Sequence, residues 1–476
     1  MTKFRFFAIL FILAVSAAVF AEESAENSGW LRTWGSGGEY STGNWISIDP
    51  DNNIVCCGHV AFPSDLNPHP IHIEHYHSGS FVTKFDNDGE FLWTRVIDTP
   101  MYFKTAVDNY GNIYVAGVYI WETDLDPSTN EFMTESPDGC DIFLLKLNPD
   151  GETVWIKTWI TGSIKELKSI AVDYENNIFL AGTYSEDIDL DPDPGEEIHR
   201  YSLGFDSFLV KMNPDGELID GYSWSNRGFF IISFISPEQS GDLLILGNFN
   251  AVTDFDPRDE VLECDTITGS TFLARYDSEM NPVWIRLWES HDGGTIIETG
   301  LAAGSDGNIY LCGDVNADLD PTSGTEVHTA ENFRQISFLV GLDSGGEYRF
   351  GRSWKSDNYV LSTGCAASPN GNVHVSGYFS GTVDLDPGES KFLATCPDEV
   401  KDAYISTFSP DGDFLWAAVW GGEEYDGSMF TATDSNGAVY VTGFYASDIQ
   451  FANGEKIFYF GENAIFLIKL LSDGSM

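Results

Sequence analysis

The stretch that decides the fold is Ala106-Val107-Asp108-Asn109-Tyr110-Gly111-Asn112-Ile113-Tyr114-Val115-Ala116-Gly117, which is followed by Asp124-Leu125-Asp126-Pro127. A second block comes next, Asp141-Ile142-Phe143-Leu144-Leu145-Lys146-Leu147-Asn148-Pro149-Asp150-Gly151, with Trp155 and Trp159 behind it. Versions of this sequence occur seven times, and the glycine that ends the first block recurs in steps of 59 to 66 residues, at Gly58, Gly117, Gly182, Gly247, Gly313, Gly377 and Gly443. Such a period indicates one large repeat domain.

Each repeat reads as four short strands. In the repeat at 160–224 the strands are expected at 169–172, at 178–182, at 207–212 and in a segment ending near Trp224. These runs are rich in β-branched and aromatic residues and are separated by Asp, Asn, Gly and Pro, which is typical of strands and turns. The pattern therefore predicts an all-β fold, a seven-bladed β-propeller built from four-stranded antiparallel blades.

The two chain ends predict how the ring closes. The last repeat has three strands and stops before a fourth, whereas Trp30-Leu31-Arg32-Thr33-Trp34 matches Trp155-Ile156-Lys157-Thr158-Trp159. We therefore expect the N-terminal strand to complete the last blade. The propeller then spans 30–476, with blades at about 35–97, 98–159, 160–224, 225–288, 289–354, 355–420 and 421–476 plus 30–34.

Several motifs of the chain are those of a known family. Gly371-Asn372-Val373-His374-Val375-Ser376-Gly377, Asp384-Leu385-Asp386-Pro387-Gly388 and Asp402-Ala403-Tyr404 are its clearest matches. By these motifs nearly the whole chain after residue 30 resembles the bacterial seven-bladed β-propeller repeat proteins (SBBP repeats). The resemblance implies a secreted or surface-associated propeller, and it carries over no catalytic residues. The segments 235–241 and 448–451 depart from the pattern.

The N-terminus predicts export. Lys3 and Arg5 precede an apolar run at 6–20, and Val19-Phe20-Ala21 is a small-residue cleavage site, so 1–21 is interpreted as a signal peptide. Residues 22–29 are expected to be a disordered acidic lead-in. The run is too short for a membrane span, so we expect no membrane insertion. The mature protein would be secreted, cell-surface or periplasmic.

The charge limits the partners. The formal net charge is −50, and loss of Lys3 and Arg5 with the signal peptide would make it −52. Charge of this size opposes binding to nucleic acid and to anionic membranes, and it suits cation binding. We expect a monomer whose partner is an unidentified extracellular protein or polysaccharide. The seven cysteines form no regular framework, so few or no disulfides and at least one free thiol are expected.

The strongest repeated polar signal is Asp-x-Asp-Pro. It occurs complete as Asp124/Asp126, Asp189/Asp191, Asp254/Asp256, Asp318/Asp320 and Asp384/Asp386. In an extended segment, residues two apart point the same way, so each pair could present two carboxylates to Ca²⁺. The alternative interpretation is that Asp forms a turn and Pro ends the strand. We also expect these motifs to share one acidic rim, opposite the rim that carries turns such as 148–151.

A histidine-rich segment at 68–77 lies in the first repeat only. His75 and His77 would share one strand face, and with His69 or His72 folding back the group could bind Zn²⁺ or Cu²⁺. The alternative is a solvated connection.

No residue is predicted to be catalytic. His291-Asp292 is a non-repeated pair that reads as a turn. The sequence therefore favours a non-catalytic binding or scaffold protein. Two alternatives stay open: a purely structural envelope component, and an extracellular polysaccharide-acting hydrolase or lyase with calcium as a candidate cofactor. An enzyme should have one non-repeated polar cluster at the central channel, and the sequence reveals none.

Overall fold

The structure is a computed structural model of the chain. It describes residues 28–476 apart from 36–40, 61–63, 67–73, 76–78, 98, 100–102, 160–163, 194, 196, 201–203, 226, 259–260, 265–268, 290–295, 316, 323, 329–335, 398, 452–455 and 458–463. The predicted signal peptide and most of the lead-in lie outside the described residues. Within the described part of the chain every named element is a β-strand, and no helix there is long and apolar enough to cross a membrane.

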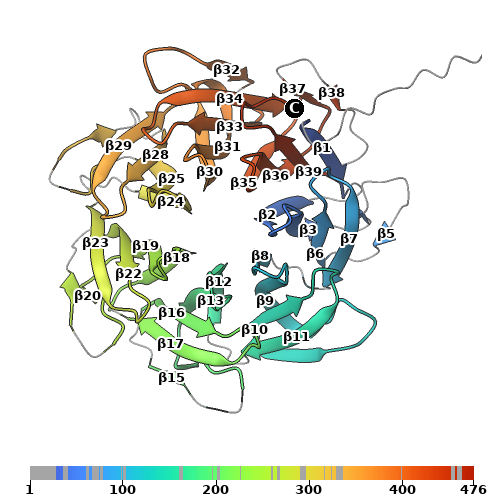
Figure 1. Cartoon of the computed structure of the whole chain (residues 1–476), viewed down its shortest axis with the longest axis vertical. Coiled ribbons are helices and arrows are strands. Elements are labelled where there is room, and N and C mark those ends of the chain that lie inside the picture. The colour runs from blue at the N-terminus through green and yellow to red at the C-terminus, as the bar shows by residue number, and fades with distance from the viewer. Residues whose placement is uncertain are drawn as a thin grey trace, which may run out of the picture.

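Seven four-stranded antiparallel blades form a closed ring, which confirms the predicted fold class (Figure 1). Blade 1 is β2 (Thr42–Ile48), β3 (Ile54–Val60), β6 (Gly79–Phe85) and β7 (Phe91–Ile97). Blade 2 is β8 (Phe103–Val107), β9 (Ile113–Asp124), β10 (Met133–Leu147) and β11 (Thr153–Trp159). Blade 3 is β12 (Ile164–Val172), β13 (Ile178–Tyr184), β16 (Asp206–Met212) and β17 (Leu218–Trp224). Blade 4 is β18 (Phe230–Pro237), β19 (Leu243–Phe249), β22 (Ser270–Tyr276) and β23 (Pro282–Glu289).

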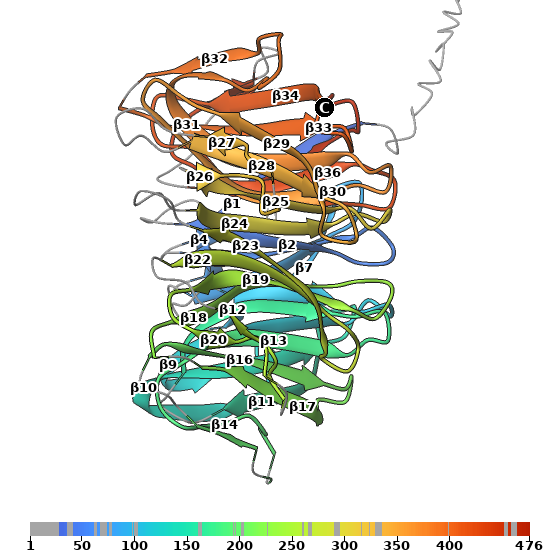
Figure 2. The ribbon, with the colours of Figure 1, turned by 90° about the vertical axis from the view of Figure 1, so that its left-hand side faces the viewer.

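The later blades repeat the arrangement. Blade 5 is β24 (Ile296–Ala303), β25 (Ile309–Val315), β28 (Ile336–Leu342) and β29 (Tyr348–Trp354). Blade 6 is β30 (Tyr359–Ala367), β31 (Val373–Asp384), β33 (Asp402–Phe408) and β34 (Phe414–Gly421). Blade 7 is β35 (Gly427–Thr433), β36 (Val439–Tyr445), β39 (Ala464–Leu470) and β1 (Trp30–Trp34). We call the four strands of a blade A, B, C and D, from the axis outward. In the side view of Figure 2 the strands run between the two rims of the ring.

The connection between strands B and C often forms a small extra hairpin, which we call the B–C hairpin. Its strands are β4 (Ser64–Asp65) with β5 (Glu74–His75), β14 (Ile188–Asp189) with β15 (Ile198–His199), β20 (Thr253–Asp254) with β21 (Glu263–Cys264), β26 (Ala317–Asp318) with β27 (Val327–His328), and β37 (Ile449–Phe451) with β38 (Lys456–Ile457). In blades 2 and 6 the hairpin continues β9 and β31 instead, and β32 (Leu393–Cys396) pairs with β31.

The N-terminal strand closes the ring, as predicted. β1 pairs antiparallel with β39, from Trp30 opposite Lys469 to Trp34 opposite Ile465. Figure 1 shows the blue β1 beside the red β39. The Trp34 ring then packs on Phe85 of blade 1, with ring centroids 5.2 Å apart. The first and last parts of the chain therefore meet in one continuous core.

The hydrophobic core lies between blades. One cluster joins blades 7 and 1 and includes Trp34, Phe81 and Tyr440, and another joins blades 2 and 3. Each sheet is apolar on both faces, so it must be covered on both sides, and a closed ring provides a neighbour for every face. The joints between blades are therefore where the stability of the fold resides.

A tryptophan and an arginine on strand D hold the next blade. In blade 1, Trp93 Nε1 donates to the Pro149 carbonyl of blade 2 at 3.1 Å, and Arg95 Nε donates to the Gly151 carbonyl at 2.7 Å. Gly151 has φ +76°, and a Cβ there would lie 2.8 Å from the Trp93 ring, so the turn needs glycine for both its conformation and its space. Equivalent D-strand contacts onto the next C–D turn are made by Trp30, Arg32, Trp155, Trp284, Arg286, Arg352 and Trp416.

The joint between blades 3 and 4 lacks this contact. Strand β17 has Asp220 where the other D strands have an aromatic residue, and the facing turn has Met280 at φ 60° where the others have glycine. With no ring above the turn, a side chain fits there.

Candidate functional site

The innermost strands carry a repeated irregularity beside the central channel. Register shifts that mark a β-bulge occur in strand A of blades 1, 3, 4, 5, 6 and 7, between Gly43/Trp45, Leu167/Ser169, Ile232/Phe234, Glu298/Gly300, Ser362/Gly364 and Ser428/Phe430. A bulge adds one residue to a strand and re-aims its side chains, and bulges are common next to functional sites. The residues around these bulges differ between blades, so the channel is not seven-fold symmetric.

Two lysines meet in the channel. Lys104 of blade 2 donates its ammonium to the backbone carbonyl of Lys168 of blade 3. The same Nζ lies 4.9 Å from the Trp45 ring centroid of blade 1 and 5.9 Å from that of Phe234 of blade 4. Burial, and then the nearby Lys168, lower the pKa of Lys104 to about 8. Lys104 therefore brings together four consecutive blades around a partly desolvated amine.

A carboxyl group of blade 5 lies near the same cluster. Glu298 is 8% exposed, and its Oε1 accepts from Ser233 Oγ at 2.7 Å and from Asn248 Nδ2. Its Oε2 has no hydrogen-bond partner among the described residues. Burial raises the pKa of Glu298, and Lys168 opposes that rise. The arrangement places an amine of lowered pKa and a carboxyl of raised pKa in one channel, which is a feature of many functional sites.

The wall formed by blades 6, 7 and 1 consists of aromatic rings and hydroxyl-bearing side chains. Trp45 stacks on Phe430, with centroids 3.9 Å apart and planes 23° apart. Thr363 Oγ1 donates to the Ser428 carbonyl at 2.9 Å. Trp45 therefore borders both this aromatic wall and the cluster of charged groups, in which Glu166 pairs with Lys168 at 2.7 Å. The sequence did not reveal this cluster, because its members occupy non-equivalent repeat positions and only the closed ring brings them together.

A cavity of about 450 Å³ opens on the rim that carries the A–B turns. It is formed by the A–B turns of blades 3 to 7 and by Ser344 from the C–D turn of blade 5. We call it the axial cavity. Its hydroxyl-bearing lining residues are Tyr174, Ser236, Ser240, Ser305, Ser344, Ser368, Thr433 and Ser435.

One charged group in the axial cavity is already neutralised. Arg275 Nε lies 2.9 Å from Glu238 Oε2 and 2.8 Å from Asp242 Oδ2, and Arg275 Nη1 donates to the Ser344 carbonyl at 2.6 Å. The lining therefore offers hydroxyl groups together with Gln239 and Asp434, and Arg275 is already paired with carboxylates. Serine is common in turns, and nothing in the sequence indicates that the serines of these different turns lie close together.

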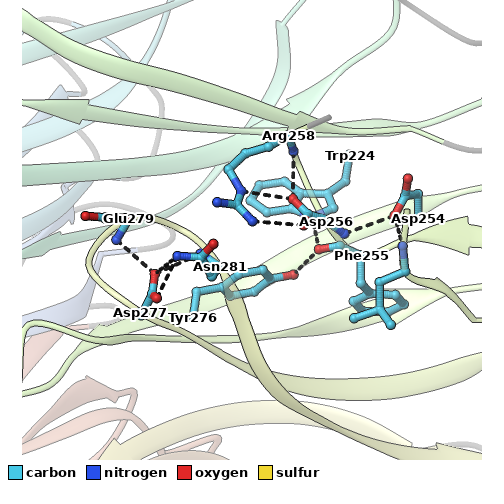
Figure 3. A network of polar contacts seen from close by, with 10 residues as sticks. Trp224, Asp254, Phe255, Asp256, Arg258, Tyr276, Asp277, Glu279 and Asn281 are labelled. Atoms are coloured by element: carbon cyan, nitrogen blue, oxygen red, sulfur yellow. Dashed lines mark hydrogen bonds and ion pairs between the residues drawn. The ribbon is translucent and has the colours of Figure 1, made fainter. Parts of the chain in front are cut away.

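The Asp-x-Asp-Pro motif builds the B–C hairpin. In blade 4, Asp254 Oδ1 accepts from the backbone amides of Asp256 at 3.1 Å and Leu262 at 2.8 Å. Asp256 in turn accepts from the Arg258 amide at 3.0 Å and from its guanidinium (Figure 3). The first carboxylate has the same two kinds of backbone partner in the motifs of Asp124, Asp189, Asp318 and Asp384. These contacts are those of the turn-forming alternative.

The second carboxylate of each motif is also engaged within its own hairpin. In blade 5, Asp320 Oδ1 accepts from the backbone amide of Thr322 at 2.8 Å and from the Thr322 hydroxyl at 2.6 Å. The equivalent amide bonds to Asp126, Asp191 and Asp386 are 2.9, 2.9 and 2.8 Å long. One oxygen of Asp320 and one of Asp318 therefore hold hairpin amides, whereas the calcium hypothesis has the pair directed together at a cation.

The middle residue of the motif joins blades. Phe255 is fully buried, and its carbonyl accepts from Trp224 Nε1 of blade 3 at 3.2 Å and from Tyr276 Oη at 2.8 Å (Figure 3). The Leu190 and Leu319 carbonyls accept in the same way from the preceding D strand. The motifs of blades 3, 4 and 5 therefore anchor their hairpins against the preceding blade.

The expectation that the motifs lie on the rim opposite the C–D turns is wrong in blade 2. Asp126 Oδ1 accepts from Thr153 Oγ1 at 2.7 Å, and Thr153 pairs with Leu147 directly beside the C–D turn 148–151. In blade 7, Phe451 of the hairpin pairs with Trp420 on strand D of blade 6. The hairpins fold back over the outer strands because the gap between blades widens away from the axis, and the buried middle residue fills it.

The histidine hypothesis falls largely outside the described residues. His69, His72 and His77 are not described, and of His75 only the backbone is, which pairs with Ser64 in the blade 1 hairpin. His291-Asp292 also lies outside.

The described side chains show no clustered metal ligands. Across the described ranges no group of three or more His, Cys, Asp or Glu side chains is arranged to hold a metal ion, and neither Asp318 with Asp320 nor any of the other four Asp pairs belongs to such a group. A calcium ion at one pair would have to complete its six to eight oxygen ligands with backbone carbonyls and water. The calcium and transition-metal assignments therefore stay predictions.

Comparison with known proteins supports a repeat protein. No protein-family model matches the chain, so the resemblance to SBBP repeats rests on its motifs alone. An uncharacterized WD repeat-containing protein of Acanthamoeba polyphaga mimivirus is 23% identical over 502 aligned positions, which cover 86% of this chain and 36% of that protein. The chain thus spans about a third of the length of this curated relative.

Two solved structures are similar to this chain at low sequence identity. A streptogramin B lyase has a TM-score of 0.41 at 9% identity, covering 93% of this chain and 99% of its own. The polysaccharide lyase Uly1 has a TM-score of 0.45 at 10% identity, covering 93% and 98%. Neither likeness bears on the activity of this chain.

Proposed function

We propose that this protein is an exported, non-catalytic binding propeller that takes a neutral, polyhydroxylated ligand, such as a segment of an extracellular polysaccharide, in the axial cavity. The supporting observation is the cavity itself. Turns from five blades converge there, and its volume of about 450 Å³ lies in the range of small-molecule sites, roughly 300–1,000 Å³.

The ligand class follows from the lining. Serine, threonine and tyrosine hydroxyls both donate and accept hydrogen bonds, and sugar hydroxyls need partners of both kinds. Arg275 is already paired with two carboxylates, so it leaves no uncompensated positive charge for an anionic ligand. A formal net charge of −50 further disfavours anions.

The test uses two matched variants. Ser344→Trp places a large side chain in the axial cavity, whereas Ser472→Trp places it at the same position of the blade 7 C–D turn, outside the cavity lining. Both serines are exposed. Titration calorimetry with a panel of neutral disaccharides and their polymers should detect binding by the native protein and by Ser472→Trp, and at least about tenfold weaker binding by Ser344→Trp, or roughly 1.4 kcal/mol. Equal affinity of the two variants, or no binding by the native protein, would contradict the proposal.

The channel cluster favours a second candidate, a polysaccharide-acting hydrolase or lyase. Lys104 and Glu298 are an amine and a carboxyl whose pKa values are moved toward neutrality, and such groups suit proton transfer. The assay measures new reducing ends and new unsaturated products from a polysaccharide panel. An enzyme should lose turnover in Glu298→Gln and in Lys104→Met while keeping turnover in Lys401→Met, whose lysine lies over Tyr378 outside the cluster. No turnover by the native protein would reject this candidate.

A further inference from the structure

Two cysteines of adjacent blades face one another. Cys312 lies on β25, strand B of blade 5, and Cys365 lies on β30, strand A of blade 6. Their exposed fractions are 0% and 4%, and both belong to the hydrophobic cluster between these blades. They are thus distant along the chain and close across one joint of the ring.

The sulfur atoms flank a single gap. A methyl group placed on Gly300 would lie 2.8 Å from Cys312 Sγ and 3.1 Å from Cys365 Sγ. Cys365 Sγ also lies 3.8 Å from the carbonyl oxygen of Tyr310, which is two residues from Cys312 on the same strand. Gly300 follows the β-bulge of blade 5, so the bulge and the absent side chain together make room for both sulfurs.

Cys56 and Cys57 are adjacent in sequence but contact different blades. Cys56 Sγ contacts Thr442 Oγ1 of blade 7 at 3.4 Å, whereas Cys57 Sγ contacts the Phe103 carbonyl of blade 2 at 3.4 Å. Adjacent residues of a strand point to opposite faces, so these two thiols lie on opposite sides of blade 1. Cys140, Cys264 and Cys396 lie at the outer hairpins of three different blades.

We propose that Cys312 and Cys365 form a disulfide that covalently joins blades 5 and 6 when the chain folds in the presence of a thiol–disulfide oxidant. With oxidised glutathione the reaction is balanced: the two thiols lose two protons and two electrons, one S–S bond forms between the two protein sulfurs, and the glutathione disulfide is reduced to two thiols. All seven cysteines are free thiols in this structure.

The bond forms during folding, once blades 5 and 6 have brought the two thiols together and while the oxidant still reaches them. A thiolate is the attacking species, and the neighbouring Cys312 thiol together with burial raises the pKa of the Cys365 thiol well above its ordinary value. In the folded protein the thiolate is therefore scarce and inaccessible. Once formed, the disulfide is shielded from reductants by the same burial, and it restricts the unfolded chain, which stabilises the fold.

The test is oxidative refolding. The reduced, denatured native chain and the variants Cys312→Ser, Cys365→Ser and Cys57→Ser are refolded with and without a glutathione redox buffer, and free thiols are then blocked. Peptide mapping without reductant should find a linked peptide containing Cys312 and Cys365 in the native chain and in Cys57→Ser, and in neither of the other variants. The linked form should also melt at a higher temperature than its reduced form.

Peptide mapping of the native chain alone decides the proposal if a serine variant fails to fold. Folded native protein without the linked peptide, or with its cross-links distributed among other cysteines, would overturn it.

Discussion

Removing the strand that closes the ring should destabilise the whole propeller. A chain that starts at Ser36 lacks β1, and with it five paired residues opposite β39. It also lacks Trp30, whose Nε1 donates to the Asn87 carbonyl at 3.0 Å, and Trp34, which packs on Phe85. The apolar faces that these rings cover would then be exposed to water.

The magnitude follows from the two buried rings. Each tryptophan is less than 10% exposed, and truncation of a buried aromatic residue costs about 3–5 kcal/mol. The pair therefore contributes roughly 6–10 kcal/mol, which is comparable to the total stability of many proteins, about 5–15 kcal/mol. For a domain of this length the unfolding entropy is about 0.9 kcal/mol per kelvin, so the melting temperature should fall by about 6–10 °C.

Calorimetry compares the truncated chain with a chain that starts at Glu22, after the predicted signal peptide. A synthetic peptide of residues 28–36 should restore part of the lost melting temperature, because it can add to the edge of β39 as a strand. The same peptide with Trp30→Ala and Trp34→Ala serves as the control and should not restore it. A truncated chain that melts at the temperature of the mature chain would refute the account of ring closure.

Three further outcomes are expected. Gly151→Ala should lower the free energy of unfolding by about 2–4 kcal/mol in urea titrations, because alanine is strained at φ +76° and its Cβ meets the Trp93 ring. Met280→Gly at the equivalent turn should change the free energy of unfolding by less than about 1 kcal/mol. Equal effects of these two changes would contradict the role of the ring. Burial raises the pKa of Asp314 to about 7, so the contribution of its neutral form to the free energy of unfolding is fully present below pH about 4 and is lost as the pH rises through 7. The free energy of unfolding of Asp314→Asn should therefore rise by roughly 2–4 kcal/mol relative to that of the native chain between pH 4 and 8. A difference that does not depend on pH would show that Asp314 does not titrate as described. If the Asp-x-Asp-Pro carboxylates bind calcium, millimolar Ca²⁺ should raise the melting temperature more than Na⁺ at equal ionic strength, and Asp189→Asn with Asp191→Asn should reduce that rise; equal shifts would leave the carboxylates as turn formers.

The architecture could be predicted from local sequence. Strand positions follow from apolar runs between Gly, Asn, Asp and Pro, and the count of blades follows from the repeat. The closing strand was found because Trp30 to Trp34 has the spacing of Trp155 to Trp159. These features are encoded within a single repeat, so periodicity alone reveals them.

The candidate sites depend on contacts between repeats. Lys104, Lys168 and Glu298 come from three blades and do not occupy equivalent positions. A β-bulge alters the direction of the side chains on the innermost strands that carry Lys168 and Glu298. The axial cavity is built from turns of five blades whose sequences are ordinary.

Only the tertiary structure could also decide where the Asp motifs lie. The sequence identified the residues of the motif. In the structure the middle residue, such as Leu125, is buried between blades, and the hairpin folds back so that Asp126 contacts Thr153. The same holds for Cys312 and Cys365, which become neighbours because blades 5 and 6 pack face to face over Gly300. The sequence by itself determined the blades and their closure, because these arise from short-range periodicity. The packing of one blade on the next decided the sites, because they arise from contacts that no single repeat contains.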